Sequence, residues 1–267
     1  MVNFQKEHYS YEDMLEIMRL LRAPGGCPWD AEQTHESIRR NFLEETCEAV
    51  EAIDNHDMPA LCEELGDVLM QVIFHAQMEA EVGGFTMRDV IDGLCRKLVY
   101  RHPHVFSDVK VANSDEVLTN WEALKRQEKA QRSTADAIDA VAKTLPALWR
   151  AEKMESKAAK AGFAWPEGSD GALRKLEEEV GELRAAVESG SVDGRHGVRE
   201  EVGDVLFMAA QVAQSHGVDP EAALHAACDK FARRFRGVED GAGGTPLDQL
   251  TEQELLDLWQ KAKQKES

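Results

Sequence analysis

Hydrophobic residues recur every three to four positions along most of this 267-residue chain, which is the spacing of one face of an α-helix. Alternation of apolar and polar residues, typical of a half-buried strand, is nearly absent, and only residues 105–112 could form a short strand. The pattern therefore predicts an all-α fold. The expected helices include residues 11–22, 61–76, 86–100, 145–161, 202–214 and 221–235.

The expected helix that includes residues 43–53 carries acids beside an apolar arc. We expect the apolar arc to face the core, and it consists of Leu43, Cys47, Val50 and Ile53. The adjoining arc consists of Glu44, Glu45 and Glu48. The acids thus border the expected core instead of opposing it.

The next expected helix, residues 61–76, is apolar around most of its circumference and bears one narrow polar stripe. The stripe consists of Glu64, Asp67, Gln71 and His75. Gly66 lies in the middle of this helix, where glycine costs about 1 kcal/mol relative to alanine. We expect a close approach by a neighbouring helix to offset that cost, and Gly203 stands at the matching place later in the chain.

The chain repeats itself at a nearly constant offset. Two adjacent glutamates and a third one turn later, followed after a break by Glu-x-x-Asp, occur twice. The first set is Glu44, Glu45, Glu48, Glu64 and Asp67, and the second is Glu178, Glu179, Glu182, Glu201 and Asp204. Trp29 and Trp165 are 136 residues apart, and Trp121 and Trp259 are 138 apart. The pattern predicts a tandem duplication.

Length and charge fit this organisation and narrow the class of protein. A chain of 267 residues suggests about two domains. We expect domains at residues 1–128 and 145–267, joined by a polar, alanine-rich linker at 129–144 without an evident buried face. A net charge of −19 argues against nucleic acid or an anionic membrane as partner. It does not exclude a small phosphorylated substrate that meets the chain through a divalent cation.

Cysteine usage and the N-terminal segment predict a cytoplasmic protein. The five cysteines are odd in number and contain no CxxC motif, so neither a disulfide framework nor a zinc site is expected. Cys47 and Cys62 fall in apolar helical patterns, where a thiol usually acts as a small buried hydrophobe. The first residues lack the apolar core of a signal peptide, and the apolar runs are too short and interrupted to span a bilayer.

The repeated acids suggest a metal site. Carboxylates three or four residues apart share a helix face and repel one another, so a cation is expected to offset the repulsion. Oxygen ligands without cysteine or paired histidine select hard divalent ions, Mg²⁺ with Mn²⁺ as a substitute. A single acidic helix face is usually only solvated. Here the clustering, its position at the start of an apolar helix and its recurrence favour a site that could hold more than one ion.

Two basic pairs accompany the acids in the two halves. Lys97 and Arg101 are four residues apart, as are Lys230 and Arg234. Such a pair is usually a surface feature with its aliphatic stems packed on apolar groups, but beside a metal cluster it suggests a phosphate contact. The tryptophans are more often core residues than platforms for a base.

Together, EExxE, the later ExxD and the Lys-x-x-x-Arg pair resemble the MazG family of nucleoside triphosphate pyrophosphohydrolases in its two-domain form. The resemblance covers nearly the whole chain, including the segment 162–165 and the closing helix with Trp259. It implies an all-α homodimer built around a four-helix bundle. It also implies Mg²⁺-dependent hydrolysis of nucleoside triphosphates to monophosphate and pyrophosphate, with broad base tolerance and a house-cleaning role.

The resemblance also assigns roles to residues of this chain. It implies ion-binding and catalytic acids at Glu179, Glu182, Glu201 and Asp204, with Glu178 adjacent. It implies substrate contacts at Lys230, Arg234, Trp259 and Trp165. The matching first-half residues are Glu45, Glu48, Glu64, Asp67, Lys97 and Arg101, with Glu44 adjacent. In two-domain relatives the C-terminal copy generally carries the hydrolysis, but this N-terminal copy departs from no motif position.

Three alternatives stay open at this point. A related all-α phosphohydrolase with a narrow substrate, such as a dUTPase or a phosphoribosyl-ATP pyrophosphohydrolase, shares the chemistry. A di-iron carboxylate bundle would need paired Glu-x-x-His motifs, and only Glu32 with His35 matches one. A helical interaction module would use the acids only for solubility. A panel of nucleoside triphosphates with Mg²⁺ separates these alternatives.

Overall fold

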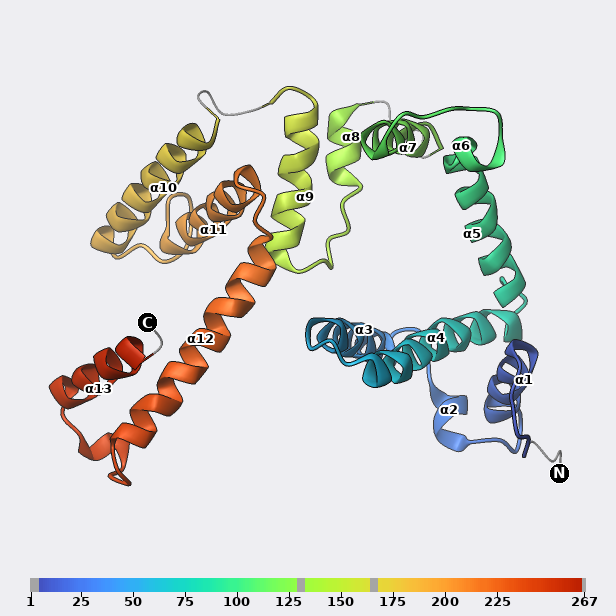
Figure 1. The fold of residues 1–267 in the computed structure, drawn as a ribbon, viewed down its shortest axis with the longest axis horizontal. Coiled ribbons are helices and arrows are strands. Elements are labelled where there is room, and N and C mark those ends of the chain that lie inside the picture. Colours follow the sequence, from blue (N-terminus) through green and yellow to red (C-terminus); the bar gives the residue numbers. More distant parts are fainter. Residues whose placement is uncertain (1–4, 129–132, 164–167, 266–267) are drawn as a thin grey trace. The chain divides into compact units, whose positions relative to one another are not determined.

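The computed structural model describes residues 5–128, 133–163 and 168–265, and the regular elements in these residues are all helical (Figure 1). The all-α prediction is confirmed. The short strand that residues 105–112 could have formed is not observed. Pro103 begins the short helix α6 (Pro103–Phe106), because proline suits the first turn of a helix. No strand is present among the described residues to pair with the segment that follows.

The chain divides into two compact units, Met1–Lys125 and Arg126–Ser267. The division falls inside α7, close to the end of the first expected domain. The helices of the first unit are α1 (Tyr11–Arg22), α2 (Pro28–Glu32), α3 (Arg39–Asp54), α4 (Met58–Glu81), α5 (Met87–Arg101), α6 and α7 (Ser114–Glu128).

Side chains cap the main helices of the first unit. Ser10 and Asp13 form a capping box at the start of α1, and Thr86 and Asp89 form another at the start of α5. Asp57 accepts a hydrogen bond from the backbone N–H of Ala60 and so begins α4. The caps satisfy backbone donors that a helix end leaves unpaired.

The core of the first unit lies between α1, α4 and the segment before α3. Its buried members are Met18, Ile38, Ile73, Phe74 and Met78. The guanidinium of Arg22 lies 5.3 Å from the centre of the Phe74 ring and forms an ion pair of 2.9 Å with Glu81. The α1 helix is therefore fixed to α4 by apolar packing and by a charged contact at its last turn.

The second unit begins with a short helix inside the expected linker. Ala137 and Val141 are buried there, and α8 packs on α9, so this segment has a buried face that the sequence did not reveal. The helices of the unit are α8 (Thr134–Asp139), α9 (Ala147–Lys160), α10 (Ser169–Ser189), α11 (Val198–Ser215), α12 (Pro220–Gly241) and α13 (Glu252–Lys265), with a 3₁₀ turn at Leu247–Gln249.

The most extensive helix pair in each unit is a helical hairpin, α3–α4 in the first and α10–α11 in the second (Figure 1). The arc that we expected to face the core in residues 43–53 is exposed. Leu43 is 58% exposed and Ile53 51%, whereas the small residues Ala49 and Ala52 are buried. Cys47 and Cys62 are exposed as well. The prediction fails because α3 turns its alanine face toward α4.

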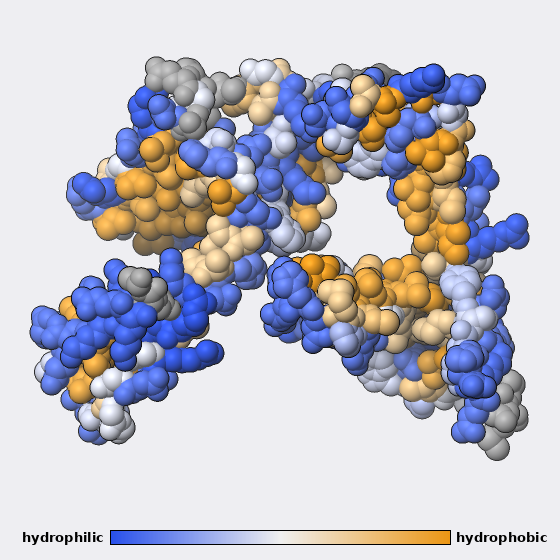
Figure 2. All heavy atoms as spheres, in the orientation of Figure 1, coloured by the Kyte–Doolittle hydropathy of each residue, from blue (hydrophilic) through white to orange (hydrophobic). Residues whose placement is uncertain are grey.

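Both hairpins therefore show apolar surface, seen in orange over α3–α4 and over α10–α11 (Figure 2). At the repeat offset, exposed Leu65 and Leu69 of α4 correspond to exposed Val202 and Leu206 of α11. A Cβ at Gly66 or Gly203 would meet no described atom within 4 Å, so the close helix approach expected at these glycines is not formed within the described chain.

None of the described helices combines the length and the apolar character needed to cross a lipid bilayer.

Candidate metal and nucleotide site

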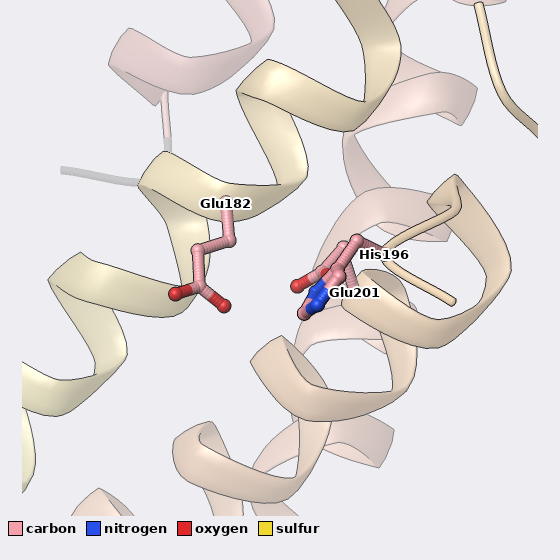
Figure 3. A group of neighbouring side chains, drawn as sticks. All are labelled: Glu182, His196 and Glu201. Atoms are coloured by element: carbon pink, nitrogen blue, oxygen red, sulfur yellow. The ribbon is translucent and has the colours of Figure 1, made fainter. Parts of the chain in front are cut away.

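The acids of the second half converge where α10 meets the first turns of α11. Glu179, Glu201 and Asp204 each place a carboxylate oxygen within 4.8 Å of the others. Glu182, His196 and Glu201 form a second group at the same separation, in which the side chains point toward one another (Figure 3). Glu201 belongs to both groups, so the two groups are adjacent.

Local sequence explains this arrangement. Glu179 and Glu182 are three residues apart on α10, and Glu201 and Asp204 are three apart on α11, so each pair shares a helix face. The helix α11 begins after Gly197, and Glu200 in its first turn accepts a hydrogen bond from the backbone N–H of His196 in the preceding loop at 2.6 Å. The hairpin then sets the two acidic faces opposite each other.

Glu201 is the most buried of these acids, with 1% of its surface exposed. Its Oε1 lies 3.2 Å from Nδ1 of His196. Its Oε2 is buried and has no hydrogen-bond partner among the described residues. A buried carboxylate oxygen without a partner is costly, because it has lost water and gained nothing in return. The position of this oxygen suits a cation bound between the helices.

The charges around Asp204 and Glu179 are unevenly compensated. Partial burial, followed by the nearby carboxylates of Glu179 and Glu201, raises the pKa of Asp204. Lys175 lies one turn before the acids on α10, and its ammonium is 2.8 Å from Glu179 and 2.9 Å from Glu178. One lysine therefore neutralises part of a cluster that otherwise carries only negative charge. Glu178 itself is exposed.

Sequence reasoning missed both His196 and Lys175. Lys175 stands three and four residues before Glu178 and Glu179, a helical ion-pair spacing that was a usable signal. His196 lies in the loop before α11, five residues from Glu201, and no helical periodicity points to it. Its backbone φ of 58° lies in the left-handed region, which is uncommon for a residue other than glycine.

The first half forms a comparable but less buried group on the α3–α4 hairpin. Glu45, Glu48 and Glu64 bring carboxylate oxygens within 4.8 Å of one another. Burial raises the pKa of Glu45, and the charges of Asp67 and Glu48 raise it further. Asp67 therefore belongs to the same cluster.

Glu44 points elsewhere in this half. Its carboxylate pairs with Arg40 at 2.7 Å on the exposed face of α3. None of the acids in this half is as buried as Glu201, since Glu45 and Glu64 are only half-buried.

The basic pair of the second half does not lie with the acids. Lys230 and Arg234 are on the part of α12 that packs on α13, where the ring of Phe231 lies 5.3 Å from that of Trp259. Gly237 of α12 also faces Ala262 of α13. Trp165 lies outside the described residues.

The first-half basic pair is also held away from its acids. Arg101 is buried, and its guanidinium lies 5.2 Å from the centre of the Trp121 ring, which also receives the ammonium of Lys125 at 4.6 Å. Lys97 is half-buried one turn earlier on α5. In each half, then, the closing tryptophan contacts the helix that bears the basic pair, which agrees with the duplication.

Comparison with known proteins identifies the domain and its two copies. The family described as "MazG nucleotide pyrophosphohydrolase domain" matches residues 33–106 and 168–238. The Escherichia coli protein named "Nucleoside triphosphate pyrophosphohydrolase" is 41% identical over 95% of this chain and 97% of its own. A Thermotoga maritima protein named "Nucleoside triphosphate pyrophosphohydrolase/pyrophosphatase MazG" is 40% identical over 95% of each chain.

A third relative is longer than this chain. YabN of Bacillus subtilis is 43% identical over 97% of this chain, which spans 53% of the length of YabN. The two matched segments contain both sets of repeated acids, so the residues that form the two acidic groups lie inside recognised domains. The chain belongs to the MazG family, whose domain it carries twice.

Proposed function

We propose that this chain is a Mg²⁺-dependent nucleoside triphosphate pyrophosphohydrolase, which converts ribo- and deoxyribonucleoside triphosphates to the monophosphate and pyrophosphate. The observation that carries the proposal is the pair of adjacent acidic groups that share buried Glu201, whose Oε2 has no hydrogen-bond partner among the described residues. The names of the Escherichia coli and Thermotoga maritima relatives support the same activity.

The donor set fits hard divalent ions. Glu179, Glu182, Glu201 and Asp204 offer oxygen ligands on facing helices, and these would hold the Mg²⁺, with Mn²⁺ as a substitute. Bound there, the metal supplies a lowered pKa for a water molecule and charge neutralisation for an in-line displacement. Two adjacent groups that share one glutamate suit two ions better than one.

The chain's own residues position the triphosphate and absorb its charge. A water oxygen attacks the α-phosphorus, the bond from that phosphorus to the α–β bridging oxygen breaks, and pyrophosphate leaves with the bridging oxygen. Lys230 and Arg234 lie on the part of α12 that packs on α13 and not with the acids, so their proposed contact is to the outer phosphates, where they would neutralise charge that develops on the departing pyrophosphate. No GxxxxGK[ST] loop is present in the sequence to cradle a γ-phosphate, so attack at the α-phosphorus is preferred.

A second copy of the chain completes this site in our proposal. The α3–α4 and α10–α11 hairpins expose apolar surface that a soluble protein rarely leaves uncovered. The apolar side chains lie beside the acids. A partner's hairpin could therefore cover the apolar side chains and leave the acids open to substrate. A homodimer with a four-helix bundle of paired hairpins also gives Gly66 and Gly203 the close neighbour that the described chain lacks.

We assign the hydrolysis to the second half. Glu201 is more deeply buried than any acid of the first-half group, and among the residues that the structure describes a lysine joins the acids in the second half alone, through Glu179. The first half then mainly supports assembly. The substrate range is broad with respect to the base, and the cellular role is house-cleaning of the nucleotide pool in the cytoplasm.

A panel of nucleoside triphosphates and deoxynucleoside triphosphates tests the proposal. Purified protein is incubated with each of them and Mg²⁺, and pyrophosphate and orthophosphate are measured separately. We expect pyrophosphate from most members of the panel and no turnover after chelation of the metal. Orthophosphate as the main product, or turnover of one nucleotide alone, would contradict the proposed reaction or its breadth, respectively.

A further inference from the structure

The second unit contains a cavity of about 150 Å³ bounded by α8, α9 and α11. These helices lie side by side in Figure 1, and α9 packs on both of the others. The cavity is too small for a drug-sized ligand, whose pockets usually measure about 300–1,000 Å³, but it can take one ring system of a larger ligand. The residues that line it are Ile138, Met154, Glu155, Ala158, Phe163, Phe207 and Gln211.

Glu155 is the ionisable residue of this lining. It is 6% exposed, and both of its carboxylate oxygens are buried without a hydrogen-bond partner among the described residues. Burial, with a smaller contribution from the charge of Glu152, raises the pKa of Glu155 to about 8. The side chain is therefore a neutral carboxylic acid at pH 7, with one donor and one acceptor side by side and, within the described part of the chain, no partner for either.

The cavity is aligned with the acidic groups along α11. Asp204 and Gln211 are seven residues apart, so they share a helix face, and Phe207 lies between them. At about 1.5 Å per residue, the lining begins about 5 Å beyond Asp204 and ends about 10 Å beyond it. An α-phosphate held at the acids would place its ribose over this interval and its base at the cavity.

We infer that the cavity binds the base of the nucleotide and that Glu155 hydrogen-bonds its Watson–Crick edge. Phe207 and Phe163, both partly exposed at the cavity, offer ring faces for stacking. This inference builds on the proposed function and adds the group that holds the base. It identifies Glu155 as a binding and specificity residue, not as a participant in bond cleavage.

A neutral carboxylic acid at Glu155 also accounts for the proposed tolerance of different bases. Each common base presents an acceptor next to a donor, namely N1 and the N6 amine in adenine, N3 and the N4 amine in cytosine, O6 and N1–H in guanine, and O4 and N3–H in uracil. A protonated carboxyl meets every one of these pairs with its O–H and its carbonyl oxygen, because either oxygen can carry the proton. The geometry thus favours nucleobases as a class over any single base.

The described residues of the first half also enclose a cavity, of about 230 Å³ between α1, α4 and the start of α5, but its lining contains no carboxylic acid. The offset of 137 residues that relates Asp67 to Asp204 pairs Phe74 with Gln211, and Phe74 is buried in the core. The offset of 136 residues that relates Trp29 to Trp165 pairs Arg19 with Glu155, and Arg19 lies on the surface in an ion pair with Glu16. A buried phenylalanine therefore stands in the first half at the position that Gln211 occupies in the second, and an exposed arginine at the position of Glu155.

The test compares the wild type with Glu155→Leu, Glu155→Gln and the control Glu152→Gln, which changes a neighbouring acid that does not line the cavity. Isothermal titration with Mg²⁺ and the α,β-methylene analogues of ATP, GTP, CTP and UTP measures binding. Turnover of the parent nucleotides and of ribose 5-triphosphate, which lacks a base, measures kcat/KM. All variants are first compared by circular dichroism.

We expect Glu155→Leu to weaken binding and to lower kcat/KM for all four nucleotides by about 10–100-fold, because the base loses both hydrogen bonds. Turnover of ribose 5-triphosphate should stay unchanged, and Glu155→Gln should restore most of the loss, since an amide also presents a donor beside an acceptor. Glu152→Gln should match the wild type.

The inference is overturned if Glu155→Leu binds and turns over the four nucleotides like the wild type. It is equally overturned if ribose 5-triphosphate suffers the same loss, because the effect would then not involve a base. A wild type that binds nucleotides without releasing pyrophosphate would contradict the proposed function alone. The binding data would still decide the role of Glu155.

Discussion

His196 and Glu201 lie with Nδ1 and Oε1 3.2 Å apart, and the histidine holds a left-handed backbone conformation in doing so. The separation is close to the roughly 3 Å between adjacent ligands of an octahedral ion with bonds of about 2.1 Å. A backbone conformation of this kind costs of order 1–3 kcal/mol and persists where the surroundings require it. We propose that His196 is a nitrogen ligand in the group that contains Glu182.

A nitrogen ligand changes metal preference, because imidazole suits transition metals better than it suits Mg²⁺. We expect His196→Asn, which tolerates the left-handed backbone, to weaken Mn²⁺ binding by about tenfold or more and to change Mg²⁺ binding little. Isothermal titration with each ion measures the ratio. Nitrogen coupling in the electron paramagnetic resonance spectrum of bound Mn²⁺ should disappear in the variant. An unchanged ratio of the two affinities would exclude His196 as a ligand.

The acids of the second half should be essential for turnover but not for folding. Asp204→Asn and Glu201→Gln each remove one ligand charge at nearly constant shape, so activity with Mg²⁺ should fall by orders of magnitude. The raised pKa of Asp204 means that the folded state disfavours its charge, and stability is lost as pH rises above the ordinary value. At pH 7, with the metal chelated, Asp204→Asn should therefore unfold at the same or a higher urea concentration. Normal turnover in both variants would contradict the assignment of the hydrolysis to the second half. The reaction would then have to take place in the first half.

The two halves can be separated by matched substitutions. Asp67 and Asp204 occupy the same position of the repeat, so Asp67→Asn is the natural control for Asp204→Asn. We expect Asp67→Asn to keep most of the pyrophosphate release, and gel filtration should show that assembly is intact. If each variant halves the rate instead, both copies are active and our assignment to the second half is wrong.

The position of bond cleavage can be read from isotope placement. Hydrolysis in ¹⁸O-labelled water should put the label into the nucleoside monophosphate, because the water attacks the α-phosphorus. Mass spectrometry of both products measures this. Label in pyrophosphate would mean attack at the β-phosphorus, and labelled orthophosphate together with the diphosphate would indicate an ordinary γ-phosphatase.

Buried Glu155 predicts an unusual dependence of stability on pH. Its pKa is raised from 4.5 to about 8 in the folded protein, so between these values the folded state holds a proton that the unfolded state has released. The stabilisation present below pH 4.5 is therefore lost as pH rises toward 8, by up to about 1.4 kcal/mol per pH unit. Urea unfolding of the wild type and Glu155→Gln should give equal stability near pH 4.5 and a growing advantage of the variant up to pH 8. A difference that does not vary with pH would show that Glu155 is ionised in the folded state.

Much of the fold follows from local rules that the sequence displays. Pro59 lies in the first turn of α4, and Asp219 with Pro220 begins α12, because a capping carboxylate and a proline suit the start of a helix. The acidic residues were found by their spacing, since i and i+3 positions meet on one helix face. The spacing does not tell which of two repeated acids is more buried, because burial depends on tertiary packing. The burial of Glu201, compared with its counterpart Glu64, was therefore not predictable from the sequence.

The failures have a common physical origin in contacts between distant parts of the chain. Leu43 and Ile53 have the periodicity of core residues. Apolar periodicity identifies a helix face that is covered, but it does not tell whether the same chain or a second molecule covers that face. Glu155 was overlooked as one more acid on an amphipathic helix. Its comparison with Arg19 at the repeat offset was an available signal, since a reversal of charge between two copies of one motif marks a change of surroundings.

Phe74 lies in the first-half core, whereas Gln211, at the same position of the repeat, lies beside the second-half cavity. We therefore expect substitutions around these two residues to have different effects. Substitutions around Phe74 remove packed volume, so in a saturation mutagenesis screen they should reduce the amount of protein in the cell while each surviving molecule keeps its specific activity. Substitutions around Gln211 act beside an opening that already exists, so they are free to alter which substrates are accepted with little loss of protein. The duplicated chain thus keeps in its first copy the packing that maintains the amount of folded protein, and in its second copy the positions that can change the accepted substrates. New substrate preferences should therefore arise mostly through substitutions in the second copy.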